Sequence, residues 1–206
     1  TLLVFFNGGG TVSFDGGVLK EINSNQANFI DGGGPSTLNI NAGGVTIDSN
    51  GFNIGTALGF TGVGGLTKIG LGTFTLTGTN TYTGDTTISN GVLQLGNGGA
   101  LGSVAGNIID NANLTTAYGV PVSYNGIISG TGSLTINQTG FFILTNNNTF
   151  SGPINIVSGG LGLGNGGTTG MVASSIIHNN TVGGVDYFRS NTDTYAGVID
   201  GVGELA

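Results

Sequence analysis

The chain has 206 residues, a formal net charge of −7, no cysteine and only three lysine or arginine residues. So few cations cannot line a phosphate backbone, which argues against nucleic-acid binding, and the lack of cysteine excludes disulfides and thiolate chemistry. Glycine supplies 44 residues, but charged residues make up only 6% and the mean hydropathy is +0.27, so there is apolar material to bury. Helices are disfavoured, because each glycine inside one costs about 1 kcal/mol relative to alanine. No run approaches the roughly 18 consecutive apolar residues of a membrane-spanning helix.

Short strands separated by turns are predicted from the N-terminus to about residue 62. Apolar and polar residues alternate with the strand period of two in five segments: Thr11–Phe14, Val18–Ile22, Leu38–Asn41, Val45–Asp48 and Phe52–Ile54. Their spacing of about ten residues is typical of an all-β array. The apolar segment Leu2–Phe6 precedes them, and we expect it to contribute to a joint between subunits.

An internal repeat dominates the middle of the chain. Residues 64–99 recur 68 residues later as residues 132–167, and the two copies agree at 18 of 36 positions without a gap. The apolar positions shared by the copies are Leu66/Leu134, Phe74/Phe142, Leu76/Leu144, Ile88/Ile156, Leu93/Leu161 and Leu95/Leu163, with Tyr82/Phe150 as a conservative exchange. The shared glycines and asparagines mark turns, since both residue types tolerate positive φ. A unit of strands and turns cannot bury its apolar stripe alone, so the repeat predicts a stacked β-solenoid.

The linkers at residues 100–131 and 168–203 are also related. Ile176-Ile177 matches Ile108-Ile109 at an offset of 68, whereas the segment from Gly197 matches the segment from Gly126 at an offset of 71. We therefore predict a three-residue insertion between Asn180 and Tyr195, at a corner of the solenoid. The chain stops where a third repeat would begin. We expect residues 1–206 to form a single solenoid domain of eight to ten rungs, as a fragment or subunit of a longer assembly.

Several phrases of the first copy resemble the passenger-associated β-strand repeat of bacterial autotransporter proteins. They are Leu66-Thr67-Lys68, Gly70, Gly72-Thr73, Leu76-Thr77-Gly78, Asn80-Thr81-Tyr82-Thr83-Gly84 and Thr86-Thr87-Ile88. The second copy departs from them at Ile136, Gln138 and Pro153. The resemblance implies an elongated, right-handed parallel β-helix without a helical domain, secreted to the bacterial cell surface for transport, adhesion or matrix formation. It implies no catalytic residue, because the repeat is a scaffold motif.

Few polar residues are candidates for chemistry, and we predict no catalytic, cofactor-binding or metal-binding site. His178 is the only histidine, and we interpret it as a corner residue, since catalysis or metal binding needs partners around it. The densest polar group is Asp186, Tyr187, Arg189 and Asp193, in the inserted corner, which we interpret as a solvated loop with an Asp–Arg pair. The other acids are scattered among turns, and no tandem nine-residue calcium repeat is present.

The function predicted from these features is structural: an extracellular or cell-surface adhesin or matrix fibre, not an enzyme. Copies are expected to associate end to end through their end rungs into a filament, because two uncapped ends make a non-closing contact. Surface glycans or other cells are further expected partners. The alternative is a polysaccharide-degrading β-helix, which needs clustered acids, or a polysaccharide-binding one, which needs exposed aromatic residues. The aromatic candidates are Tyr118, Tyr124, Phe141 and Tyr187.

Overall fold

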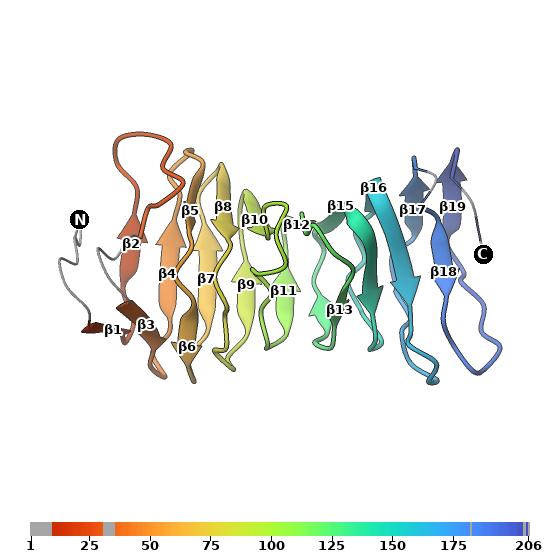
Figure 1. Cartoon of the computed structure of the whole chain (residues 1–206), viewed down its shortest axis with the longest axis horizontal. Coiled ribbons are helices and arrows are strands. Elements are labelled where there is room, and N and C mark those ends of the chain that lie inside the picture. The colour runs from red at the N-terminus through yellow and green to blue at the C-terminus, as the bar shows by residue number, and fades with distance from the viewer. Residues whose placement is uncertain (1–9, 31–35, 182, 204, 206) are drawn as a thin grey trace.

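A computed structural model describes residues 10–30, 36–181, 183–203 and 205, and every regular element in them is a β-strand. The strands are β1 (Gly10–Phe14), β2 (Val18–Lys20), β3 (Ser36–Ile40), β4 (Val45–Asp48), β5 (Ile54–Thr56), β6 (Phe60–Gly62), β7 (Leu66–Ile69), β8 (Thr73–Leu76), β9 (Thr86–Ile88), β10 (Val92–Leu95), β11 (Ile108–Asp110), β12 (Asn113–Thr116), β13 (Val122–Tyr124), β14 (Ile128–Ser129), β15 (Ser133–Leu144), β16 (Ile154–Leu163), β17 (Ile176–Asn179), β18 (Val185–Tyr187) and β19 (Val198–Gly201). They lie side by side along the long axis of an elongated molecule, with the N-terminal strands at one end and the C-terminal strands at the other (Figure 1).

The strands stack as a parallel β-solenoid of about eight turns, which confirms the predicted fold class. The main ladder runs β5–β8–β10–β12–β15–β16–β17–β19, a second runs β2–β4–β7–β9–β11–β14, and β1–β3–β6 form a third. Every pairing between strands of the described part is parallel. One turn takes about 20 residues, since Leu66 pairs with Thr86 and Leu114 with Leu134.

The core is a column of apolar side chains along the solenoid axis. On the main ladder, the inward residues of six successive rungs pair directly and are fully buried: Phe74, Leu93, Leu114, Leu134, Ile154 and Ile177. The alternate positions on the same strands point outward and carry mostly Thr, Asn, Ser or Gln. The strand period read from the sequence therefore sorts the side chains correctly between core and surface. The predicted apolar segment Leu2–Phe6 lies outside the described residues.

The register corrects the predicted position of the insertion. Ile177, not Ile176, occupies the place of Ile108, because Ile177 pairs with Ile154 of the second copy as Ile108 pairs with Thr86 of the first. The offset has therefore already grown to 69 residues at β17. It reaches 71 at β18, where Val185 pairs with Leu161 as Leu114 pairs with Leu93. The extra residues thus lie on both sides of β17, and the sequence match was misled by two adjacent isoleucines.

Strand β2 ends at Lys20, two residues before the predicted end at Ile22. The cause is Glu21, whose buried Oε1 accepts the backbone N–H groups of Ile22 at 2.8 Å, Asn23 at 2.7 Å and Ser24 at 3.4 Å. Because these three N–H groups bind one carboxylate oxygen, they are not available for hydrogen bonds in a β-ladder. A bend at residues 21–24 follows from this local competition between side chain and sheet.

The first copy holds a polar pair in its core where the second copy is apolar. The hydroxyl groups of Tyr82 and Thr86 lie 2.6 Å apart and are both fully buried. The corresponding residues of the second copy are Phe150 and Ile154, also fully buried. Both partners have changed together, so neither copy leaves a hydroxyl group unpaired at these two core positions.

Lys68 is a second buried polar residue of the first copy. Its ammonium group donates to the carbonyls of Ile69 at 2.9 Å, Gly70 at 2.8 Å and Asn90 at 3.2 Å, and burial lowers its pKa to about 8, opposed in part by the charge of Asp48. It therefore holds two successive turns together. In the second copy Ile136 fills the position.

Candidate functional site

The single histidine lies on a strand and not at a corner, which corrects the prediction for it. His178 is on β17, and its Nδ1 is 2.7 Å from Oδ1 of Asp200 on the next rung, β19. Both side chains are substantially exposed, so this pair contributes little to stability. On the other side His178 pairs in register with Asn155 of β16. The arrangement is an imidazole–carboxylate contact on an open sheet face.

The predicted polar corner is partly a strand, since Asp186 and Tyr187 belong to β18. The expected Asp–Arg pair is present: Nη1 of Arg189 is 2.8 Å from Oδ2 of Asp193, and Nη2 donates to the carbonyl of Thr168 at 2.6 Å. Desolvation raises the pKa of both Asp186 and Tyr187. The guanidinium of Arg189 thus joins the segment that follows β18 to Thr168 of the preceding turn.

The remaining acids serve separate turns. Asp15 accepts the N–H of Gly43 at 2.8 Å, Asp48 accepts that of Asn50 at 2.8 Å, and Asp48 also pairs with Lys20 at 3.2 Å. In the described part of the chain, no three His, Cys, Asp or Glu side chains are grouped so that they could hold a metal ion. Asp15 and Asp48 therefore act at separate places, where each also joins its turn to a neighbouring rung.

Asp110, like Glu21, is a buried acid. Its side chain is fully buried at the end of β11, and Oδ1 accepts the N–H of Ala112 at 3.0 Å. Burial raises the pKa of its carboxyl to about 6, although hydrogen bonds from the backbone at Ala112 and Leu114 oppose the shift. In the linker after the second copy, Asn179 occupies the position that corresponds to Asp110, because Asn179 pairs with Ile156 as Asp110 pairs with Ile88.

We expect Asp110→Asn to stabilise the protein at pH 7 by about 2 kcal/mol, because the variant buries no charge. The folded carboxyl of Asp110 binds its proton more tightly than the unfolded one, so wild-type stability should fall as pH rises from about 4 to about 6, and this fall should shrink in the variant. Urea denaturation across this pH range measures both effects. The exposed Asp85→Asn is the control and should keep the wild-type pH profile. Coinciding profiles for wild type and Asp110→Asn would contradict the expectation.

Two of the four aromatic candidates are core residues. Tyr118 and Tyr124 are buried, and the hydroxyl of Tyr124 donates to the carbonyl of Gly106 at 2.6 Å. Phe141 lies at the surface in a T-shaped contact with Phe188, with ring centroids 6.1 Å apart. Phe188 and Tyr187 contribute to a hollow of about 440 Å³ beside Ile143 and Arg189. Sequence reasoning missed Phe188, which meets Phe141 only because β18 stacks two rungs after β15.

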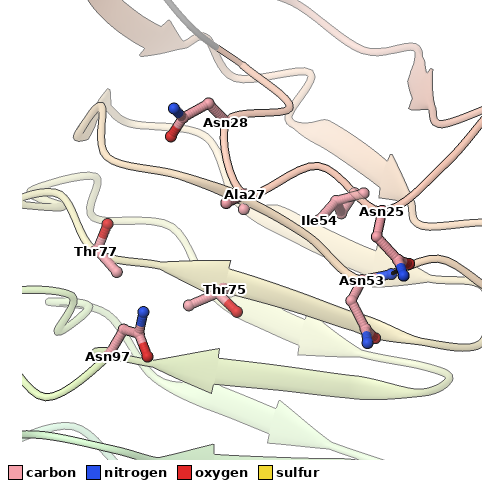
Figure 2. A pocket seen from close by; sticks show the side chains of 9 residues that line it. Asn25, Ala27, Asn28, Asn53, Ile54, Thr75, Thr77 and Asn97 are labelled. Carbon is pink, nitrogen blue, oxygen red and sulfur yellow. Dashed lines mark hydrogen bonds between the residues drawn. The ribbon is translucent and has the colours of Figure 1, made fainter.

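A second hollow, of about 470 Å³, was not foreseen from the sequence. Its walls come from the segment after β2, from β5 and β8, and from the turn after β10 (Figure 2). We call it the asparagine hollow; its residues are Asn25, Ala27, Asn28, Asn53, Ile54, Gly55, Thr75, Thr77 and Asn97. Four amides, two hydroxyl groups and the methyl group of Ala27 line it, and none of the lining residues is charged; the side chain of Ile54 itself is buried in the core. The only signal in the sequence is the polar run at residues 23–28, which lacks the strand alternation around it.

The comparisons with known proteins agree with the repeat. Residues 66–95 match the Passenger-associated-transport-repeat family. The Adhesin BmaC autotransporter of Brucella suis biovar 1 (strain 1330) is 49% identical over 77 residues, which are 36% of this chain and 2% of that protein. An Extracellular serine protease of Serratia marcescens is 43% identical over 70 residues, which are 34% of this chain and 6% of that protein. No solved structure matches the chain.

These matches confirm the predicted resemblance to autotransporter passenger repeats and point to a cell-surface or extracellular location. The matched residues 66–95 comprise β7 to β10, in the interior of the solenoid. The alignments span only a small part of each relative, so they bear on the repeat and not on the whole of either protein. In the described residues, no helix has the length and apolarity needed to cross a membrane.

Proposed function

We propose that this chain is an adhesin-like part of a cell-surface passenger, which presents polar side chains on a rigid scaffold. The observation that carries the proposal is the uncharged and mostly polar face of the main ladder between β8 and β16. Its outward residues include Thr73, Thr75, Gln94, Asn113, Thr115, Ser133, Thr135 and Asn155, with Val92 as an apolar position between Thr73 and Asn113. Such a face offers hydrogen-bond donors and acceptors without strong hydration by charge. The 49% identity to a protein named as an adhesin supports the same role.

We further propose that the chain itself has no active site. In the described residues, Asp15 and Asp48 are bonded at separate turns and Asp200 is bonded to His178, and no three acids or histidines are grouped so that they could hold a metal ion. The protease activity in the name of the second relative belongs to a protein of which this chain matches 6%. The repeat shared with that relative is a stacking unit, and stacking units occur in passengers of different activities.

An attachment assay tests the proposed function. Beads coated with the purified chain should attach to host-cell layers, matrix or bacterial cells several-fold more than albumin-coated beads. A matched variant, Thr73→Lys with Asn155→Lys, puts charge on the polar face at two side chains that form no hydrogen bond or ion pair within the described residues, and it should attach less. Attachment of chain-coated beads at the albumin level on all three surfaces would overturn the proposal.

End-to-end association of copies is a further part of the proposal. In the described residues β19 forms a ladder only with β17, and Val198 and Val202 nearby are 58% and 87% exposed. A strand with one free edge can template another parallel strand. Sedimentation across a dilution series should then show species larger than the monomer at high concentration. Monomers throughout the series would overturn this part and leave the adhesin role in place.

A further inference from the structure

We propose that the asparagine hollow binds a neutral saccharide. The inference deepens the proposed function, because it names the class of ligand that one part of the surface would hold. Four side-chain amides from three separate parts of the chain face one space of about 470 Å³, within the usual range for small-molecule sites of about 300–1,000 Å³ (Figure 2).

The wall formed by residues 25–30 is fixed to the solenoid before any ligand arrives. Gln26 forms a parallel bridge with Ile54, its N–H donates to the carbonyl of Asn53 at 2.9 Å, and its carbonyl accepts the N–H of Gly55 at 2.9 Å. Phe29 adds a backbone hydrogen bond to the carbonyl of Gly55 at 2.7 Å. The buried carboxylate of Glu21 orders the start of this segment. A preformed wall reduces the ordering entropy that a ligand would otherwise have to offset.

Two of the amides are held in one orientation with their nitrogens unused. Oδ1 of Asn25 accepts the backbone N–H of Asn53 at 2.8 Å, and Oδ1 of Asn53 accepts that of Thr73 at 3.0 Å. A backbone N–H can only donate, so these contacts fix which atom of each amide is the oxygen. In the described part of the chain, no protein acceptor takes a hydrogen bond from the Nδ2 groups of Asn25 and Asn53. They remain as donors at the rim of the hollow.

The chemistry of the lining selects the class of ligand. Amides and hydroxyl groups both donate and accept, which suits the paired hydroxyl groups of a sugar ring, and the exposed methyl group of Ala27 suits its C–H face. No carboxylate lines the hollow, which disfavours a divalent cation, and no Lys or Arg lines it, which disfavours phosphate. A peptide would add to a free strand edge, but the edge of β5 is already occupied by Gln26.

Titration of the whole chain with neutral oligosaccharides tests the inference. The probes are oligomers of glucose, galactose and N-acetylglucosamine, with a sialylated oligosaccharide and an unstructured peptide as comparisons, followed by calorimetry and by NMR chemical shifts. At least one neutral oligomer should bind saturably. Asn28→Ala and Asn97→Ala should each weaken that binding about tenfold, the effect of losing one hydrogen bond. Both side chains are exposed and form no hydrogen bond with the described part of the chain, so the unfolding midpoint should stay at the wild-type value.

The chain offers a matched control in its second copy. Asn165 is the repeat equivalent of Asn97, is exposed in the same Gly-Asn-Gly-Gly turn, and lines a different hollow. Asn165→Ala should therefore leave saccharide binding unchanged. Failure of every neutral oligomer to bind, binding of only the charged sugar or the peptide, or equal effects of Asn97→Ala and Asn165→Ala would overturn the inference. If coated beads still attach to cells when both Asn28→Ala and Asn97→Ala are present, the adhesin role stands without this site; if oligomers bind but beads do not attach, the reverse holds.

Discussion

The Gly84→Ala variant is expected to lose about 3 kcal/mol of stability, although Gly84 does not adopt a positive φ. A Cβ atom on Gly84 would overlap the backbone of Gly64 and Gly65 on the preceding turn. The glycine is needed because the two backbones approach closely, so a methyl group would push neighbouring rungs apart. Urea denaturation followed by circular dichroism measures the loss.

The close approach at Gly84 belongs to a column of glycines at one corner of the solenoid. A Cβ on Gly106 would overlap Gly84, and a Cβ on Gly126 would meet the carbonyl of Gly106. The control is Gly99→Ala, since a Cβ there has nothing within 4 Å and its φ is not positive. That variant should be as stable as wild type or slightly more so, because alanine restricts the unfolded chain. Equal stability of Gly84→Ala and Gly99→Ala would refute the close-packing explanation.

Asn80→Ala is the second substitution expected to cost about 3 kcal/mol. Asn80 is 5% exposed, and its amide joins three successive turns: Oδ1 accepts the N–H of Phe60 at 3.1 Å, while Nδ2 donates to the carbonyls of Gly78 at 3.1 Å and Ser103 at 3.2 Å. Alanine would remove the partner of three backbone groups, two of which belong to the buried residues Phe60 and Gly78. Thermal and urea unfolding should both register the loss.

The second copy provides an independent repetition of this test. Asn148 is 2% exposed, accepts the N–H of Ile128 at 2.8 Å and donates to the carbonyls of Asn146 and Met171 at 2.6 and 3.4 Å. Asn148→Ala should therefore cost a similar amount. The control is the exposed Asn90, whose side chain forms no hydrogen bond among the described residues, and Asn90→Ala should change stability by less than about 0.5 kcal/mol. A loss at Asn90 equal to that at Asn80 would show that these asparagines stabilise the turns by local conformation alone.

Local repetition in the sequence was enough to determine the fold class. Alternation in Phe74–Thr77 and Val92–Leu95 predicts which side chains are buried, and the structure pairs Phe74 with Leu93 in the core. These predictions succeeded because burial in a strand depends on a period of two, which any short segment displays. The resemblance at residues 66–95 to a passenger repeat was also readable from consecutive residues.

The contacts between successive turns of the solenoid were determined only by the tertiary structure. The sequence assigned the repeat glycines to positive-φ turns, which holds for Gly72 and Gly91, whereas Gly84 is required by its approach to the turn before it. The contact of Phe141 with Phe188 depends on residues far apart in the chain. The asparagine hollow likewise needs Asn25, Asn53 and Asn97 on different turns. The strand period along the chain determines whether a side chain points into the core or outward. The stacking of turns, with its irregular offsets, determines which side chains come into contact. The scaffold could therefore be predicted from the sequence, whereas the candidate binding surface could not.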